Sequence, residues 1–437
     1  MSVRQYIKRL FKSKFIHNTG WIMFAQIYQM ILSLVIGTLG ARYLGPSNYG
    51  TINYAASYIS FFSIACALGL EGIVVKEMID DRTNEGVILG SSIVMRLGAG
   101  ALSMFAVCVL VAVLNPGDRV LLVVTFLQSL ALLFNAAHII ETWYQSVLWS
   151  KIPSVIKCIA YTGMSLYRVW LLATKKSVEW FAFAASLDAL IIAVLFFIRY
   201  KRDGWFKLHF NLAVGRHLVE ESYHLIISYL MAAVYNQMDR LMIGRMIDQT
   251  HVGYYSAAST ICHMWLFIPT ALANSASPLI MELRASSEEL YIKRIKQLTG
   301  AIFWLGVIFA IGITLSADLI IDIMYGPAYT EAKVPLIIIV WSTVFSALSN
   351  SRSIWMICEK KQKYAKHILF WGVLVNLALN SMWIPTIGMN GAATATILTE
   401  GLCCFVVPYF IKQTRNYVRY QFDALNPIRL VKEILGK

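Results

Sequence analysis

Charged side chains stand inside long apolar stretches of this 437-residue sequence. Arg96, Arg168 and Arg240 could bind an anion, because the planar fork of guanidinium donors matches phosphate oxygens. The carboxylates that could take up a proton or another cation are Asp188, Asp239, Glu400 and Glu141. A charge costs roughly 2.5–3.5 kcal/mol at the centre of a membrane helix, so each side chain is expected to face protein or water. Two interpretations stay open: a water-filled cavity for an anionic ligand with ion coupling, or a set of structural ion pairs.

The apolar stretches also contain neutral polar groups and helix breakers. Asn376 and Asn380 stand four residues apart on one helix face, where they could bind sugar hydroxyls or hold neighbouring helices together. Pro269 and Pro278 lie in one stretch, and each can kink a helix into a gate, although prolines are also merely tolerated in membrane helices. Aromatic side chains in these stretches could stack on sugar rings or act as interfacial anchors. They are Tyr28, Tyr54, Tyr58, Trp143, Tyr144, Tyr161, Tyr167, Trp170 and Tyr235.

Nothing in the sequence predicts a catalytic residue, a cofactor site or a metal site. The sequence contains no P-loop, GxSxG, HExxH or Rossmann pattern in the structural context that such a motif needs to function. The seven cysteines lie within or beside apolar stretches and form no CxxC pair, which favours buried apolar packing. The longest internal link, 200–221, is too short for a catalytic domain. We therefore expect that the protein is not an enzyme and has no cofactor.

The composition predicts which elements position these groups. Hydrophobic residues make up 58% of the chain and charged residues 14%, whereas a soluble protein carries about 25% charge. A stretch of about 20 apolar residues crosses the bilayer core as a helix. The sequence therefore predicts an all-α polytopic membrane protein with about twelve transmembrane helices. Their expected limits are 18–40, 50–74, 87–114, 119–146, 152–174, 178–199, 222–246, 252–282, 299–324, 334–357, 365–387 and 390–412.

The positive charges indicate the orientation of these helices. With twelve spans, 28 of the 38 Lys and Arg residues fall at the two ends of the chain, in the even-numbered links or in the ends of the spans beside them. Only six fall in the odd-numbered links or in the span ends beside those. Because Lys and Arg collect on the cytoplasmic side, both termini are expected in the cytoplasm. The net charge of +14 is then a sign of membrane orientation, and no nucleic-acid partner is expected.

A short internal similarity suggests two copies of one unit. The segment 50–55, GTINYA, resembles the segment 253–258, GYYSAA, at an offset of 203 residues. Six spans in each half would give parallel repeats with a cavity between them. The expected organisation is a six-helix lobe at 1–199, a cytoplasmic amphipathic linker at 200–221, a second six-helix lobe at 222–412 and a basic cytoplasmic tail at 413–437.

Five stretches resemble one known family, in order and with consistent spacing along the whole chain. LGPSNYG at 44–50, ETWYQ at 141–145, and MDRLMIG at 238–244 followed by VGYYSAA at 252–258 are similar to motifs of the polysaccharide flippases. YGPAYTEA at 325–332 is a further match. The fifth matching stretch contains Asn376, Asn380, Pro385, Gly388 and the residues 391–393. These flippases belong to the multidrug/oligosaccharidyl-lipid/polysaccharide exporter superfamily, whose two-lobed fold resembles that of the multidrug (MATE) exporters.

The resemblance implies a Wzx-like flippase that moves an undecaprenyl-pyrophosphate-linked O-antigen or exopolysaccharide unit across the bacterial inner membrane. The expected partners are this lipid-linked oligosaccharide, membrane lipids, coupling protons or sodium ions, and polysaccharide polymerase and chain-length proteins. The first alternative is a multidrug exporter of the same fold, whose cationic substrates would favour an acidic cavity. The second alternative is a membrane glycosyltransferase or polymerase, which would need a larger domain outside the membrane than the links between the spans provide.

Overall fold

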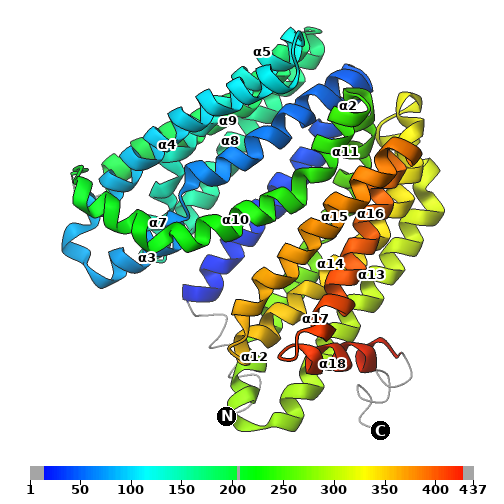
Figure 1. Cartoon of the computed structure of the whole chain (residues 1–437). Coiled ribbons are helices and arrows are strands. Elements are labelled where there is room, and N and C mark those ends of the chain that lie inside the picture. The colour runs from blue at the N-terminus through cyan, green and yellow to red at the C-terminus, as the bar shows by residue number, and fades with distance from the viewer. Residues whose placement is uncertain (1–13, 204–206, 427–437) are drawn as a thin grey trace. The chain divides into compact units, whose positions relative to one another are not determined.

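A computed structural model describes residues 14–203 and 207–426, and every regular element within these ranges is helical. The helices group into two compact units (Figure 1). Unit 1 comprises the described residues up to Leu44 together with Thr51–Ala233. Unit 2 comprises Gly45–Gly50 and the described residues from Val234 onward. The six residues Gly45–Gly50 thus lie early in the sequence but pack with its later half.

Unit 1 is built around helices that pack on α9. Its helices are α2 (Lys14–Ala67, without Gly45–Gly50), α3 (Leu70–Asp80), α4 (Glu85–Leu114), α5 (Arg119–Ser129), α6 (Ala131–Phe134), α7 (Ile140–Ser146), α8 (Lys151–Ala173), α9 (Val178–Asp203) and the first part of α10 (Leu212–Met246). Helix α9 packs against α5, α6 and α8, and α4 packs against α5. The core between them is apolar, with Leu89, Ile140, Tyr144 and Phe196 fully buried.

Unit 2 is built around α14. Its helices are the rest of α10, α11 (Gln249–Met264), α12 (Phe267–Ser286), α13 (Glu288–Met324), α14 (Lys333–Cys358), α15 (Ala365–Ile387), α16 (Met389–Gly401), α17 (Val407–Phe410) and α18 (Arg415–Leu425). Helix α14 packs against α11, α12, α13 and α16. The short amphipathic helix α18 lies on α13, where Lys296 pairs with Asp423 at 2.7 Å.

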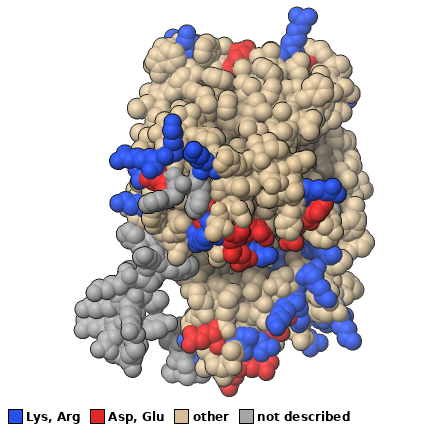
Figure 2. Space-filling view, turned by 90° about the vertical axis from the view of Figure 1, so that its left-hand side faces the viewer, with Lys and Arg blue, Asp and Glu red and all other residues tan. Residues whose placement is uncertain are grey.

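The surfaces of the long helices are those of a membrane protein. Large apolar side chains point outward, such as Phe105 on α4 (72% exposed) and Leu315 on α13 (84% exposed). On the face shown in Figure 2 most of the surface carries no charge, and the charged side chains gather in a few groups. In water such apolar area would drive association, whereas lipid tails solvate it.

Nine helical runs within the described residues are long and apolar enough to cross a membrane. The first run, Gly20–Asp80, includes two of the twelve expected spans, 18–40 and 50–74. The expected spans 152–174 and 222–246 lie in α8 and α10, which are more polar and are not among the nine. The chain is therefore a multi-pass helical membrane protein, and the count of twelve stays a prediction.

Four of the expected spans or turns show breaks with local causes. The turn after the first span is one residue, Gly45, whose φ of 72° takes it out of the helix before Pro46. A second break at Leu68 and Gly69, both with positive φ, separates α2 from α3. The expected span 119–146 contains a 3-10 segment at Asn135–Ile139. The expected span 252–282 breaks between α11 and α12, where Pro269 has no N–H to bond the carbonyl of Trp265.

The internal similarity places two glycines against each other. A Cβ added to Gly50 would lie 1.7 Å from the carbonyl oxygen of Gln249, and one added to Gly253 would lie 2.1 Å from that of Pro46. Gly50 and Gly253 are 203 positions apart, as are Pro46 and Gln249, and this is the offset between the two similar segments. The contact is reciprocal, as contacts between two copies related by a local two-fold axis are.

Candidate functional site

Arg96 of α4 is buried inside unit 1. Its side chain is 3% exposed, and its Nη2 lies 3.7 Å from Oε1 of Glu71 on α3. Its Nε and Nη1 atoms are buried and have no hydrogen-bond partner among the described residues. Because Glu71 is mostly exposed, the pair compensates only part of the cost of burying the guanidinium. Arg96 therefore combines a charge partner with unused donors.

Arg168 of α8 and Asp188 of α9 form a second pair of opposite charges in unit 1. The two helices pack side by side, and the charges attract each other. The Oδ1 atom of Asp188 is buried and has no hydrogen-bond partner among the described residues. The sequence suggested both residues, and the structure brings them together.

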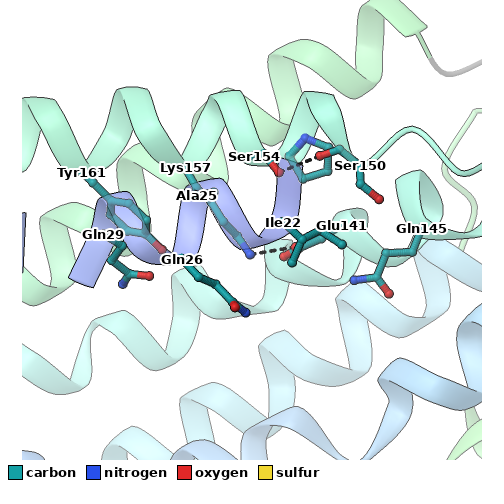
Figure 3. A pocket seen from close by; sticks show the side chains of 11 residues that line it. Ile22, Ala25, Gln26, Gln29, Glu141, Gln145, Ser150, Ser154, Lys157 and Tyr161 are labelled. Carbon is teal, nitrogen blue, oxygen red and sulfur yellow. Dashed lines mark hydrogen bonds and ion pairs between the residues drawn. The ribbon is translucent and has the colours of Figure 1, made fainter. Parts of the chain in front are cut away.

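Glu141 of α7 pairs with Lys157 of α8, with Nζ 2.7 Å from Oε1 (Figure 3). Both side chains are about three-quarters buried, at 23% and 27% exposed. The carboxylates of Glu71, Glu141 and Asp188 in unit 1 thus each face a cation.

The Glu141–Lys157 pair lines a cavity of about 270 Å³ within unit 1. Its walls come from the start of α2, from α7 and from the first half of α8 (Figure 3). Most of the lining is polar. It consists of Gln26, Gln29, Glu141, Gln145, Ser150, Ser154, Lys157 and Tyr161, with Ile22, Ala25 and Pro153 as the apolar part.

Asp239 of α10 is at the centre of a polar cluster in unit 2. Its Oδ2 accepts hydrogen bonds from the hydroxyls of Tyr255 (2.5 Å) and Thr396 (2.6 Å), and its Oδ1 accepts one from Nδ2 of Asn380 (2.8 Å). Asn380 also donates to Oδ1 of Asn376 at 3.0 Å. The carboxylate forms no ion pair within the described part of the chain, and all its partners are neutral.

Arg240, Arg352 and Glu400 of unit 2 also lie next to neutral polar groups, and Arg352 in addition attracts the carboxylate of Glu400. Arg240 follows Asp239 directly but points elsewhere, and donates to Oε1 of Gln237 (3.2 Å) and to the hydroxyl of Ser259 (3.4 Å). This agrees with the expectation that neighbouring residues lie on different helix faces. Arg352 donates to the carbonyl oxygen of Cys403 at 2.7 Å. Glu400 of α16 faces the buried hydroxyl of Tyr235.

Sequence reasoning missed three kinds of contributors to these sites. Tyr255 and Thr396 carry hydroxyls of a type that is common in membrane helices, so nothing distinguished them in the sequence. Lys157 was not recognised as the partner of Glu141, because the two residues are 16 positions apart on different helices. Gln26 and Gln29 are uncharged, but two amides three residues apart in an apolar stretch were a signal. No group of three His, Cys, Asp or Glu side chains in the described ranges could hold a metal ion.

The fold resembles that of MurJ and of the MATE transporters. The lipid II flippase MurJ in an inward closed conformation superposes with a TM-score of 0.69 at 13% identity, covering 97% of this chain and 93% of that one. An inward-facing multidrug resistance MATE family transporter of the MOP superfamily also gives 0.69 at 10% identity, covering 90% of this chain and 95% of that one. At these identities the likeness concerns the fold alone.

The sequence identifies the family within this class of transporter. The model of the family described as "Polysaccharide biosynthesis protein" matches residues 15–284, and the MatE family model matches residues 225–382. The chain belongs to the polysaccharide biosynthesis protein family. It is 24% identical to a protein of Escherichia coli (strain K12) named as an O-antigen transporter, over 68% of this chain and 77% of that protein. It is also 24% identical to the low-salt glycan biosynthesis flippase Agl15 of Haloferax volcanii, over 92% and 84%.

Proposed function

We propose that the chain is a flippase that moves a pyrophosphate-linked oligosaccharide on a polyprenyl lipid across the membrane by alternating access. The observation that carries the proposal is the family match over 15–284, together with two relatives whose names assign them O-antigen transport and glycan flipping. The lipid II flippase fold supports it, because lipid II is also a lipid-linked sugar. The polar groups inside the helices supply the chemistry that such a substrate needs.

The charges favour this substrate over the drugs of a multidrug exporter. A cationic drug would be attracted by unpaired carboxylates, but Glu71, Glu141 and Asp188 of unit 1 already face Arg96, Lys157 and Arg168. A lipid pyrophosphate is an anion and would be attracted by guanidinium donors. The unused nitrogens of Arg96 are such donors. A glycosyltransferase is not supported, because the relatives are transporters.

Arg96, Arg168 and Arg240 are the proposed pyrophosphate contacts. Arg240 donates hydrogen bonds to two neutral partners, and neither offsets its positive charge. Glu71 and Asp188, in contrast, partly offset the charges of Arg96 and Arg168. Arg96→Ala should abolish transport by protein that still inserts normally, and Arg96→Lys should retain part of it. Full transport by a well-folded Arg96→Ala, Arg168→Ala double variant would contradict these contacts.

Asp239 is the proposed coupling residue, ahead of Asp188, Glu400 and Glu141. A carboxylate with only neutral partners retains a net negative charge, and its cluster offers further oxygen ligands from Thr396, Asn376 and Asn380. The Oδ1 atom of Asn380 is buried and has no partner among the described residues. Carboxylate, amide and hydroxyl oxygens together suit a hard cation such as sodium, and the carboxylate alone suits a proton.

The proposed orientation places both termini and the 283–298 link in the cytoplasm of a cell whose inner membrane holds the protein. It depends on the 28 to 6 distribution of Lys and Arg. Reporter domains fused after residues 210, 290 and 437 should all report a cytoplasmic position. A signal from the opposite side at any of the three would contradict the twelve-span topology.

A flipping assay tests the function itself. Purified protein is reconstituted in liposomes with a fluorescent polyprenyl-pyrophosphate-linked oligosaccharide, and a membrane-impermeant quencher measures its transfer between leaflets. We expect transfer that requires the protein and that accelerates under a sodium or proton gradient. Transfer that is no faster than in empty liposomes would contradict the flippase. Transfer that persists unchanged when both gradients are collapsed would contradict only the coupling.

A further inference from the structure

The cavity inside unit 1 has a chemistry that none of the charged sites has. Its described lining is electrically neutral, because the only charges among those residues, those of Glu141 and Lys157, form an ion pair at 2.7 Å. A pyrophosphate entering it would meet the Glu141 carboxylate, and a cationic drug would meet the Lys157 ammonium. Either ligand would have to break the pair. A neutral polar ligand could instead hydrogen-bond both groups and leave the pair intact.

Three glutamine amides line this cavity with unused hydrogen-bonding capacity. Gln26 and Gln29 come from α2 and Gln145 from α7. None of the three forms a hydrogen bond to another residue in the described part of the chain. Each amide offers two donors and one acceptor, which is the pairing that a hydroxyl group needs. Figure 3 shows Gln26 close to the ion pair of Glu141 and Lys157, and Gln29 close to Tyr161.

The rest of the lining and the size fit a sugar ring. A sugar presents hydroxyls at its edge and C–H groups on its faces, and the ring of Tyr161 together with Ile22 and Pro153 offers apolar contact. The cavity of about 270 Å³ lies at the lower end of the range for small-molecule sites, about 300–1,000 Å³. It therefore suits one monosaccharide unit.

The position of the cavity agrees with the direction of transport. Its lining comes from the start of the expected span 18–40, the end of the span 119–146 and the start of the span 152–174. In the topology that the Lys and Arg distribution predicts, all three are the cytoplasmic ends of their helices. The cavity would then lie in the half of the membrane from which a newly made lipid-linked sugar arrives.

We propose that this cavity, lined by Gln26, Gln29, Gln145, Tyr161 and the Glu141–Lys157 pair, binds one neutral sugar residue of the transported lipid. The inference rests on the proposed flippase function and adds a recognition site for the sugar. The site is separate from the arginines proposed for the pyrophosphate. It makes the protein sensitive to the identity of the sugar, whereas the pyrophosphate contacts are common to every lipid of this class.

Binding measurements with matched probes test this site. The full-length protein in nanodiscs is titrated with polyprenyl pyrophosphate and with its derivatives bearing glucose, galactose or N-acetylglucosamine. We expect at least one sugar-bearing probe to bind more tightly than the bare pyrophosphate. In the Gln26→Leu, Gln29→Leu variant this preference should fall about tenfold, which is the loss of two neutral hydrogen bonds, while binding of the bare pyrophosphate is unchanged.

Two further variants control for folding and for the chemical change. Gln413→Leu makes the same substitution at an exposed position outside the cavity and should keep the preference. Gln26→Asn, Gln29→Asn keeps both amides and should keep part of it. A preference that is unchanged in the folded Gln26→Leu, Gln29→Leu variant would overturn the site, as would the absence of any preference in the wild type. If no probe binds, with or without a sugar, the flippase proposal itself fails.

Discussion

Four carboxylates within the helices of the two units have different kinds of partner. In unit 1 Glu71 faces Arg96, Glu141 faces Lys157 and Asp188 faces Arg168. In unit 2 Asp239 is held by two hydroxyls and an amide. A paired charge contributes to structure and is neutral to its surroundings. The electric field of a charge with neutral partners is not cancelled by an opposite charge, so this charge can attract a mobile ion. We propose from this difference that Asp239 of unit 2, and not the three paired carboxylates of unit 1, couples transport to an ion.

Replacing Asp239 by Asn should produce the largest difference between the units. The substitution keeps the shape and removes the charge that would attract the coupling ion. We expect gradient-driven flipping to fall by about 5- to 150-fold, the range of typical coupling energies. Asp188→Asn in unit 1 is the matched control, and it should reduce gradient dependence much less. Equal losses in the two variants, measured in liposomes with imposed sodium and proton gradients, would remove the distinction.

Breaking an ion pair in unit 1 should affect stability more than transport coupling. Glu141→Gln leaves Lys157 without its partner, and we expect a loss of about 1.5–3 kcal/mol in the free energy of unfolding. The double variant Glu141→Gln, Lys157→Met removes both charges and should recover most of that loss. Glu220→Gln provides the control, because its pair with Arg216 is exposed and should contribute less than about 1 kcal/mol. Additive losses in the thermal unfolding of the double variant would show that the pair is not a unit.

Removing one neutral donor from Asp239 should have a smaller effect. Thr396→Val deletes a hydroxyl that lies 2.6 Å from Oδ2, and we expect a loss of about 0.5–1.5 kcal/mol together with a weaker apparent affinity for the coupling ion. Thr394→Val on the same helix deletes a hydroxyl that bonds only the carbonyl of Asn390, so it is the matched control. If both variants shift the ion concentration for half-maximal flipping equally, Thr396 has no special role.

The smallest effect is expected at Asp81, outside the membrane spans. Hydrogen bonds from the side chain of Thr83, from Asn84 and from the Thr83 backbone N–H lower the pKa of this exposed carboxyl below its usual 3.8. The stabilisation is therefore present above the ordinary pKa and is lost as the pH falls through the lowered value. Asn84→Ala should raise the pKa toward 3.8, as an NMR titration of the Asp81 carboxyl would show. An unchanged titration would mean that neutral donors do not stabilise this carboxylate.

Hydropathy predicts the helices well because crossing a bilayer requires long apolar runs. It could not predict the breaks at Leu68 and Gly69 or at Asn135–Ile139, because the surrounding residues continue the apolar pattern. The break before Pro269 was the exception, since proline lacks the backbone N–H that a helix needs. The sequence thus predicted the positions of the membrane-spanning helices better than the positions of the breaks within them.

The candidate sites were predicted one residue at a time. Asp239, Asn376 and Asn380 were each singled out from the sequence, but nothing showed that they form one cluster, because 141 positions separate Asp239 from Asn380. Their grouping depends on how α10, α15 and α16 pack. In the same way, only the packing of the helices shows that the hydroxyls of Tyr255 and Thr396 contact Asp239 and that the glutamine amides of unit 1 line one cavity.

The reciprocal contact of Gly50 and Gly253 limits how the two similar segments can change. A side chain at either glycine would overlap a carbonyl group of the other segment, at Gln249 or Pro46, so neither position can accept a larger residue on its own. Elsewhere the two segments differ freely, as 51–55 and 254–258 show. At this one point a change in one segment is blocked by the backbone of the other. The contact therefore couples the two segments, and it leaves glycine as the residue that both must keep.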